Sequence, residues 1–293
     1  MTRILVIGKS GQLAQALVDV GGGKIICPGR PIVDLLDSKS HAAALERFSP
    51  DVVINTGAFT AVDGAEGESE TAYALNVEGP RNLALACAEK GLPLIHLSTD
   101  CVFDGAKSAP YTPEDATRPL GVYGQTKLHG ELAVHEVAEK SIVVRVSWLF
   151  SRFGANFVRT MLNAARTRET VNVVSDQVGC PTHAPDLAQA LISVAEQIAV
   201  PGFAAWGAYH IAGKGETDRA SMTRRIYEVS ASFGGPVAKV IPVLTADYPT
   251  PAQRPLNARL DMAKAREVFS IDMPDWTEGL NTTVEALVRE RVA

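Results

Sequence analysis

The chain has 293 residues, 46% of them hydrophobic, and a formal net charge of −5. This length can bury the core of one large or two modest domains, and an acidic chain without basic blocks argues against nucleic acid or an anionic membrane as its main partner. No apolar run approaches the ~18 residues of a membrane span, and four widely spaced cysteines argue against a disulfide framework or structural zinc, so a reducing cytoplasm is expected.

Short apolar runs alternate with stretches of helical spacing through the first half of the chain. The spacing predicts strands at 4–7, 24–27, 51–55, 92–98 and 142–146, and helices at 12–20, 38–48, 70–90 and 123–140. Ser38 is expected to cap the second of these helices. Strands that are apolar on both faces are typical of a parallel sheet covered on both sides, so we expect an α/β fold with a Rossmann-type doubly wound sheet.

Beyond about residue 150 the alternation loosens, and proline and glycine become denser. Helices are still predicted at about 156–166 and 184–198. We therefore expect residues 1–150 to form the doubly wound domain and residues 151–293 to form a smaller substrate-binding lobe. Segments of this lobe are candidates for returning to the sheet.

Polar or glycine-rich residues follow four of the predicted strands, at 8–11, 55–58, 98–100 and 147–148. In open parallel sheets, ligands bind in the crevice outside the carboxyl ends of the strands. The four segments therefore point to one crevice.

The segment Gly8-Lys-Ser-Gly11-Gln-Leu-Ala14 joins the first predicted strand to the first predicted helix. Glycine permits the tight turn and lets the backbone approach a pyrophosphate, whose charge the helix N-terminus favours. The alternative is a strand–helix turn without a ligand. The surrounding strand–helix–strand pattern favours a dinucleotide, so residues 1–150 are predicted to bind NAD(P).

The second predicted strand leads into Cys27-Pro-Gly-Arg30, with no carboxylate before Asp34. A carboxylate there would bind the adenosine ribose and repel a 2′-phosphate, whereas Arg30 can pair with that phosphate. NADPH is therefore the cofactor we predict, with NADH as the alternative if Arg30 is only a solvated loop residue.

Tyr123-Gly-Gln-Thr-Lys127 places a phenol and an ammonium on one face of a predicted helix. Carbonyl reduction needs a hydride from the nicotinamide and a proton for the new alkoxide, which Tyr123 can donate. The ammonium of Lys127 is expected to lower the tyrosine pKa from its usual ~10. Thr99, with Asp100 alongside, is expected to hydrogen-bond the substrate carbonyl. A surface Tyr–Lys pair is the alternative.

These motifs, in this order, resemble the extended short-chain dehydrogenase/reductases and, within them, the reductases of dTDP-linked 4-keto-6-deoxy sugars. The resemblance runs nearly end to end, and its more discriminating segments are 147–150, 176–182 and 254–257. It implies NAD(P)H-dependent reduction of the C4 keto group of dTDP-4-dehydro-L-rhamnose to give dTDP-L-rhamnose. Another nucleotide-sugar 4-keto reductase or epimerase is an alternative, and so is a non-catalytic NADP-binding regulatory subunit.

The resemblance also implies roles for single residues, beside the alternatives of a core aromatic for Trp148 and a surface side chain for Arg254. The cofactor residues are expected to be Gly8, Gly11, Gln12 and Leu13 at the pyrophosphate, Arg30, Asp34 and Leu35 near the adenosine, Ala58, Phe59 and Thr60 along the dinucleotide, and Tyr123 and Lys127 at the nicotinamide ribose. The substrate residues are expected to be Thr99, Asp100 and Trp148 at the sugar and Arg254 at the diphosphate.

Three positions depart from the family pattern. Cys101 replaces the usual tyrosine near the sugar, and Phe59 replaces a tyrosine or histidine. Some members join their subunits through magnesium held by glutamates, but the matching position in the first helix is Ala16, so no metal is predicted. A homodimer is an assembly that the resemblance allows.

Overall fold

The computed structural model describes residues 1–290. Its centre is a parallel six-stranded sheet with the strand order β10-β5-β4-β3-β1-β2, which confirms the predicted Rossmann-type fold class. The strands are β1 (Ile4–Ile7), β2 (Ile25–Ile26), β3 (Val52–Asn55), β4 (Leu94–Thr99), β5 (Ser141–Val146) and β10 (Gly207–His210).

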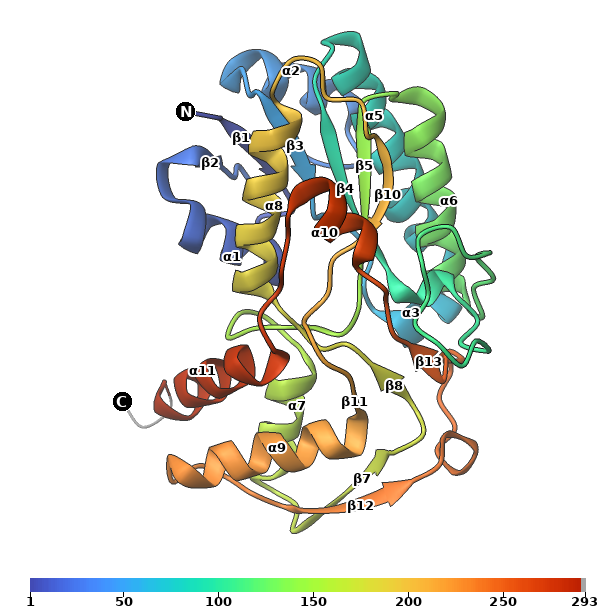
Figure 1. Ribbon diagram of the computed structural model, residues 1–293, viewed down its shortest axis with the longest axis vertical. Helices are drawn as coiled ribbons and strands as arrows, with labels where there is room; N and C mark the ends of the chain where they lie inside the picture. The colour runs from blue at the N-terminus through green and yellow to red at the C-terminus, as the bar shows by residue number, and fades with distance from the viewer. Residues whose placement is uncertain (291–293) are drawn as a thin grey trace.

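Helices cover both faces of this sheet (Figure 1). One face packs against α1 (Gln12–Gly21), α8 (Ala184–Ile198) and α10 (Ala263–Phe269), which share one hydrophobic core with the sheet. The other face packs against α2 (Ser38–Phe48), α5 (Gly79–Glu89) and α6 (Val122–Val137) in a second core. Strands β1 and β3 are buried along their whole length and are almost wholly apolar, as their sequences indicated.

Three local features differ from the predictions. Asp37, not Ser38, caps α2: its backbone is extended and its carboxylate accepts a hydrogen bond from the Lys39 amide at 3.1 Å. The second strand spans only residues 25–26, because the chain then turns away into an exposed loop. The single helix predicted over 70–90 is α4 (Ser69–Tyr73), a π-helical turn (Ala74–Glu78) and α5.

The second half of the chain contributes both to the central sheet and to a smaller layer. Strand β10 pairs with the outer edge of β5, and α8 packs beside α1. The remaining part gathers around a separate hydrophobic core below the sheet in Figure 1. It contains α7 (Phe157–Ala164), α9 (Arg219–Ser232), α11 (Trp276–Arg289), β7 (Thr170–Val174), β12 (Lys239–Val243), β8 (Val178–Gly179), β11 (Thr217–Asp218), β13 (Asn257–Ala258), β6 (Leu149–Phe150) and β9 (Thr182–His183).

Within residues 1–290, no helix combines the length and apolar character that crossing a bilayer requires. In the same range, no cluster of three or more His, Cys, Asp or Glu side chains is arranged to hold a metal ion.

Candidate active site

A cavity of about 730 Å³ lies at the carboxyl ends of β1, β3, β4 and β5, between the sheet and the smaller layer. It is where the polar strand ends were expected to meet. The predicted site residues that line it are Gly8, Gly11, Gln12, Leu13, Ala58, Thr60, Thr99, Asp100, Tyr123, Lys127, Trp148 and Arg254.

Four predicted cofactor residues lie outside the lining of this cavity. The Arg30 side chain is 80% exposed, and its guanidinium lies 3.9 Å from the Asp34 carboxylate. Leu35 belongs to the core between the sheet and α2 and α5. The Phe59 backbone exchanges two hydrogen bonds with the Asn76 side chain. The structure therefore does not bring these four side chains together with the others.

The turn between β1 and α1 requires glycine at its first position. Gly8 has φ +111°, and a Cβ there would lie 2.6 Å from Thr56 Oγ1. The turn closes through a hydrogen bond from the Gly11 amide to the Gly8 carbonyl at 2.9 Å. No side chain caps the N-terminus of α1, and no acidic residue lies in its first turn. The backbone donors beside the cavity are thus free to bind an anion.

Tyr123 and Lys127 lie near the start of α6, and both line the cavity. Lys127 Nζ donates a hydrogen bond to the Leu97 carbonyl at 2.6 Å. Burial lowers the pKa of Lys127 to about 8, and the charge of Glu131 acts in the opposite direction. Burial also raises the pKa of Tyr123, which a hydrogen bond with Thr99 opposes. The net pKa of Tyr123 is therefore raised in this state of the site, because burial is the largest influence on it, and the lowering effect of Lys127 stays a prediction.

Thr99, Asp100 and Cys101 form a tight polar turn after β4. Thr99 Oγ1 donates to Asp100 Oδ1 at 2.8 Å and accepts from the Cys101 amide at 3.1 Å. Burial raises the pKa of Asp100, while hydrogen bonds with Ser147 and Thr99 and the charge of Arg219 oppose that rise. The Cys101 thiol, 3.5 Å from Asp100 Oδ1, also has a pKa raised by burial. Cys101 is therefore a neutral group in this turn.

Trp148 enters the cavity from an unusual backbone conformation, with φ +46°. Gly179 makes room for it, because a Cβ at that position would lie 2.5 Å from the indole. The Arg219 guanidinium stacks 3.5 Å from the Trp148 ring centroid and 4.7 Å from that of Phe157. Trp148 is thus a cavity wall held between a glycine and a cation.

Of the charged residues that line this cavity, Arg219 is the one that the sequence did not single out. It lies at the first position of α9, and within the described residues it makes no ion pair within 4.0 Å. Burial lowers its pKa to about 10, against the attraction of Asp100, so it is cationic at neutral pH. No periodicity or motif marks this arginine. Only folding brings α9 over the ends of β4 and β5.

Arg254 also lines the cavity, but it is already paired with a carboxylate. Its Nη1 and Nη2 donate to the two oxygens of Asp63 at 2.9 and 2.8 Å. This hydrogen bonding holds the pKa of Asp63 below its usual range. Arg254 is therefore fixed in place, and part of its charge is compensated.

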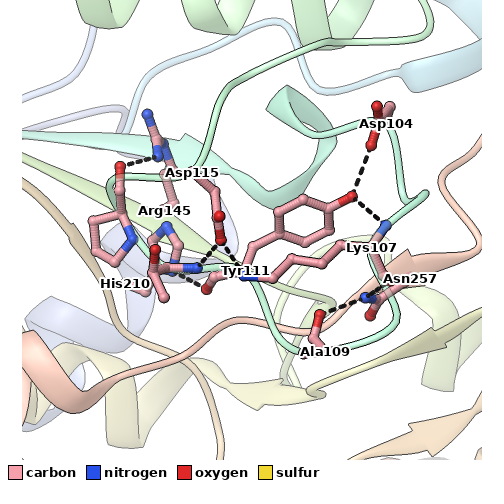
Figure 2. Close-up of polar contacts among 10 residues, drawn as sticks. Asp104, Lys107, Ala109, Tyr111, Asp115, Arg145, His210 and Asn257 are labelled. Carbon is pink, nitrogen blue, oxygen red and sulfur yellow. Dashed lines mark hydrogen bonds and ion pairs between the residues drawn. The ribbon is translucent and has the colours of Figure 1, made fainter.

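The loop 104–115, between β4 and α6, is held by hydrogen bonds to distant segments of the chain (Figure 2). Tyr111 Oη donates to Asp104 at 2.7 Å, and the Tyr111 carbonyl accepts from His210 Nδ1 at 3.0 Å. Asn257 Nδ2 donates to the Ala109 carbonyl at 2.9 Å. The loop between β4 and α6 is thus joined both to β10 and to the segment that carries Arg254.

The chain is similar to known proteins along nearly its whole length. The family model of the RmlD substrate binding domain matches residues 1–289. The chain is 42% identical to a dTDP-4-dehydrorhamnose reductase of Sinorhizobium fredii, covering 98% of each chain, and 37% identical to that of Escherichia coli, covering 97% of each.

Solved structures are similar as well. A dTDP-4-dehydrorhamnose reductase of Clostridium acetobutylicum superposes with a TM-score of 0.89 at 33% identity, covering 97% of this chain and 99% of that one. One of Bacillus anthracis in complex with NADP gives a TM-score of 0.88 at 30% identity, covering 96% and 98%.

Proposed function

The chain belongs to the family of the RmlD substrate binding domain, and on that premise we infer that it is an NADPH-dependent reductase. It reduces the C4 keto group of dTDP-4-dehydro-L-rhamnose to give dTDP-L-rhamnose. The observation that supports this best is the meeting of Thr99, Tyr123 and Lys127 with the Gly8 turn in one cavity. Oxidation of NADPH by the purified protein, dependent on the dTDP-linked 4-keto sugar, tests it. Bound cofactor without turnover would instead favour a regulatory subunit.

The residues at the glycine turn fit the diphosphate of NADPH. The uncapped N-terminus of α1 offers the amides of Gln12 and Leu13, and Gly8 and Gly11 let a phosphate approach the backbone. Tyr123 would face the nicotinamide ribose with its neighbouring lysine. When bound, NADPH supplies the hydride for the reduction.

We assign the proton of the reaction to Tyr123. Its raised pKa keeps the phenol protonated at neutral pH, as the donor in a reduction must be. Lys127, still largely cationic below about pH 8, attracts the phenolate after the proton has left. The Thr99 hydroxyl donates to Asp100 in this structure, and rotation of its O–H would aim the same proton at the substrate oxygen.

We assign the sugar nucleotide to the side of the cavity formed by Trp148, Arg219 and Arg254. Trp148 offers an apolar wall for the 6-deoxy sugar. Arg219, without an ion-pair partner in the described residues, is the better cation for the diphosphate, because Arg254 is shared with Asp63. Residues 151–293 are thereby proposed as the substrate-binding lobe. The absence of a tyrosine at Cys101 leaves a thiol beside the sugar.

Replacing Arg219 with methionine should raise the KM for the sugar nucleotide about 10- to 100-fold and change kcat much less, the loss expected for one charge-assisted contact. Arg224, exposed on the same helix, provides the matched control: Arg224→Met should leave the KM unchanged. Steady-state kinetics at fixed NADPH measure both. An Arg219→Met enzyme with the wild-type KM would assign the diphosphate elsewhere.

Replacing Arg30 with alanine should raise the KM for NADPH roughly threefold to tenfold, because a largely exposed guanidinium contributes a modest ion pair. The side chain is free enough to swing toward a 2′-phosphate, since only a 3.9 Å contact with Asp34 restrains it. The KM for NADH, which has no such phosphate, serves as the internal control. Equal KM values for NADPH before and after the substitution would remove Arg30 from the site.

We also propose where the protein is located and how it assembles. A reducing cytoplasm suits the four cysteines, all of which are free. A homodimer would cover Tyr73 and Leu132, which are 44% and 59% exposed on the neighbouring helices α4 and α6. Light scattering of the purified protein gives the assembly directly.

A further inference from the structure

Glu131 is a buried carboxylate to which the steps above assign no role. It is 3% exposed and lies on α6, one helical turn beyond Lys127. Its Oε1 accepts hydrogen bonds from the Ser98 hydroxyl and from Arg145 Nε, the latter at 3.0 Å, and its Oε2 accepts from Arg145 Nη2 at 2.7 Å. A buried ion pair adds little net stability compared with an apolar replacement. Lys127 and Glu131 are both buried and four residues apart on one face of α6, so the carboxylate is near enough to act on the lysine through its charge.

The partners of Glu131 tie α6 to the two strands that end at the cavity. Ser98 of β4 and Arg145 of β5 are paired in register, and both side chains converge on the carboxylate. The residue before Ser98 holds Lys127, because the Leu97 carbonyl accepts the hydrogen bond from its Nζ. One stretch of β4 thus fixes the lysine through its backbone and the glutamate through a side chain.

Arg145 also joins this arrangement to the loop 104–115. It is 5% exposed, and its Nη1 donates to the Pro113 carbonyl at 3.2 Å, in the loop whose contacts Figure 2 shows. Its guanidinium also lies 5.2 Å from the Phe103 ring centroid. Arg145 therefore cannot swing away from Glu131 without releasing the loop.

We propose that Glu131 is a positioning residue for Lys127: its carboxylate, fixed by Ser98 and Arg145, keeps the lysine protonated beside Tyr123. The proposal rests on the reduction proposed above, in which a cationic Lys127 stabilises the phenolate. It adds a residue that touches neither substrate nor cofactor and acts only through the lysine.

The charges around Lys127 are consistent with this role. On α6, Tyr123 is a neutral phenol and Glu131 is an anion. On β4, His96 is buried, and burial together with the charge of Lys127 holds its pKa well below the usual value, so it is neutral. On β5, the Arg145 cation pairs with Glu131 and offsets part of its charge, while Glu131 remains the group whose charge raises the pKa of Lys127. Asp100, in the turn after β4, acts on Tyr123.

The pKa of Lys127 gives the direction of the effect. Burial lowers it to about 8, and Glu131 is the charged group that opposes this shift. A lower lysine pKa means that the ammonium is lost at a lower pH. Removing the charge of Glu131 should therefore make Lys127 lose its proton nearer neutrality, and reduction should fail at a lower pH.

The test is a pH titration of the protein without cofactor, labelled with ¹³C at the lysine ε-carbon and followed by NMR. The Lys127 signal is assigned by its absence in Lys127→Met, and in wild type it should titrate near pH 8. In Glu131→Gln the midpoint should fall by roughly half a pH unit or more. Glu136→Gln removes the same charge from an exposed position of α6 and should leave the midpoint unchanged.

A second variant covers the risk that Glu131→Gln does not fold with Arg145 left unpaired. Glu131→Gln combined with Arg145→Gln leaves no lone buried charge and should move the midpoint in the same direction. A Lys127 midpoint at the wild-type pH in the folded variants overturns the proposal.

Kinetics separate this proposal from the proposed function. In variants that keep activity, the pH at which kcat/KM falls on the alkaline side should decrease together with the Lys127 midpoint. If the midpoint shifts and the pH profile of kcat/KM does not, the link to catalysis is overturned. If the midpoint shifts while wild type itself reduces no 4-keto sugar, the proposed reaction fails and the effect of Glu131 on Lys127 stands.

Discussion

Tyr123→Phe is expected to lower kcat by about 10²- to 10⁴-fold, which is the usual contribution of a positioned proton donor. The substitution removes the phenolic oxygen alone and keeps the ring, so the cavity wall retains its shape. The KM for NADPH should change little, because the glycine turn and Lys127 remain. Initial rates of NADPH oxidation with the dTDP-linked 4-keto sugar measure the effect.

Tyr73 offers the matched control for this variant. It is 44% exposed on α4 and has no place in the cavity, so Tyr73→Phe should keep the wild-type kcat. Fluorescence titration with NADPH shows whether each variant still binds cofactor. A Tyr123→Phe enzyme within about tenfold of wild type would assign the proton to another group.

Gly130→Ala is expected to lower the free energy of unfolding by about 2–4 kcal/mol, which is as large as or larger than most overpacking substitutions in a protein core cost. Gly130 lies on α6 where the helix meets the π-helical turn, and a Cβ there would lie 2.0 Å from the Asn76 carbonyl oxygen. That neighbour is backbone, so no side chain can rotate to make room. Relief requires α6 to move, and α6 carries Tyr123 and Lys127.

Urea unfolding gives the loss of stability, and kinetics on the folded fraction should show a lower kcat as well. Gly67→Ala is the control, because Gly67 ends α3 (Val62–Gly67) and a Cβ there would meet nothing within 4 Å. If Gly130→Ala unfolds at the same urea concentration as wild type, then the close approach of α6 to the π-helical turn does not limit stability.

Local chemistry explains which parts of the fold were predictable. A strand buried on both faces, such as Ile4–Ile7, is a run of apolar residues between turn signals, and its bounds follow from that pattern. The π-helical turn at Ala74–Glu78 has no such signal, because its extra residue is stabilised by tertiary contacts. The hydrogen bonds of Asn76 with Phe59 and with Thr126 are such contacts, and they join distant parts of the chain.

The candidate site likewise contains residues that the sequence predicts and residues that it does not. Gly8, Tyr123 and Lys127 lie in short motifs with fixed spacing, and the structure brings them to one cavity. Arg219 belongs to no motif, because its place depends on how the smaller layer packs over the sheet. The predicted fall in the Tyr123 pKa made no allowance for burial, which raises that pKa, because burial is a property of the folded chain and sequence spacing does not measure it.

The return of β10 to the sheet has a consequence for synthesis. Domains near the N-terminus generally fold while the rest of the chain is still being made. Here the outer edge of β5 stays unpaired until Gly207–His210 emerges, about 60 residues after β5 is complete. An open edge strand is a template for pairing with another polypeptide. During synthesis, therefore, the half-made sheet exposes one edge strand that its last strand covers later.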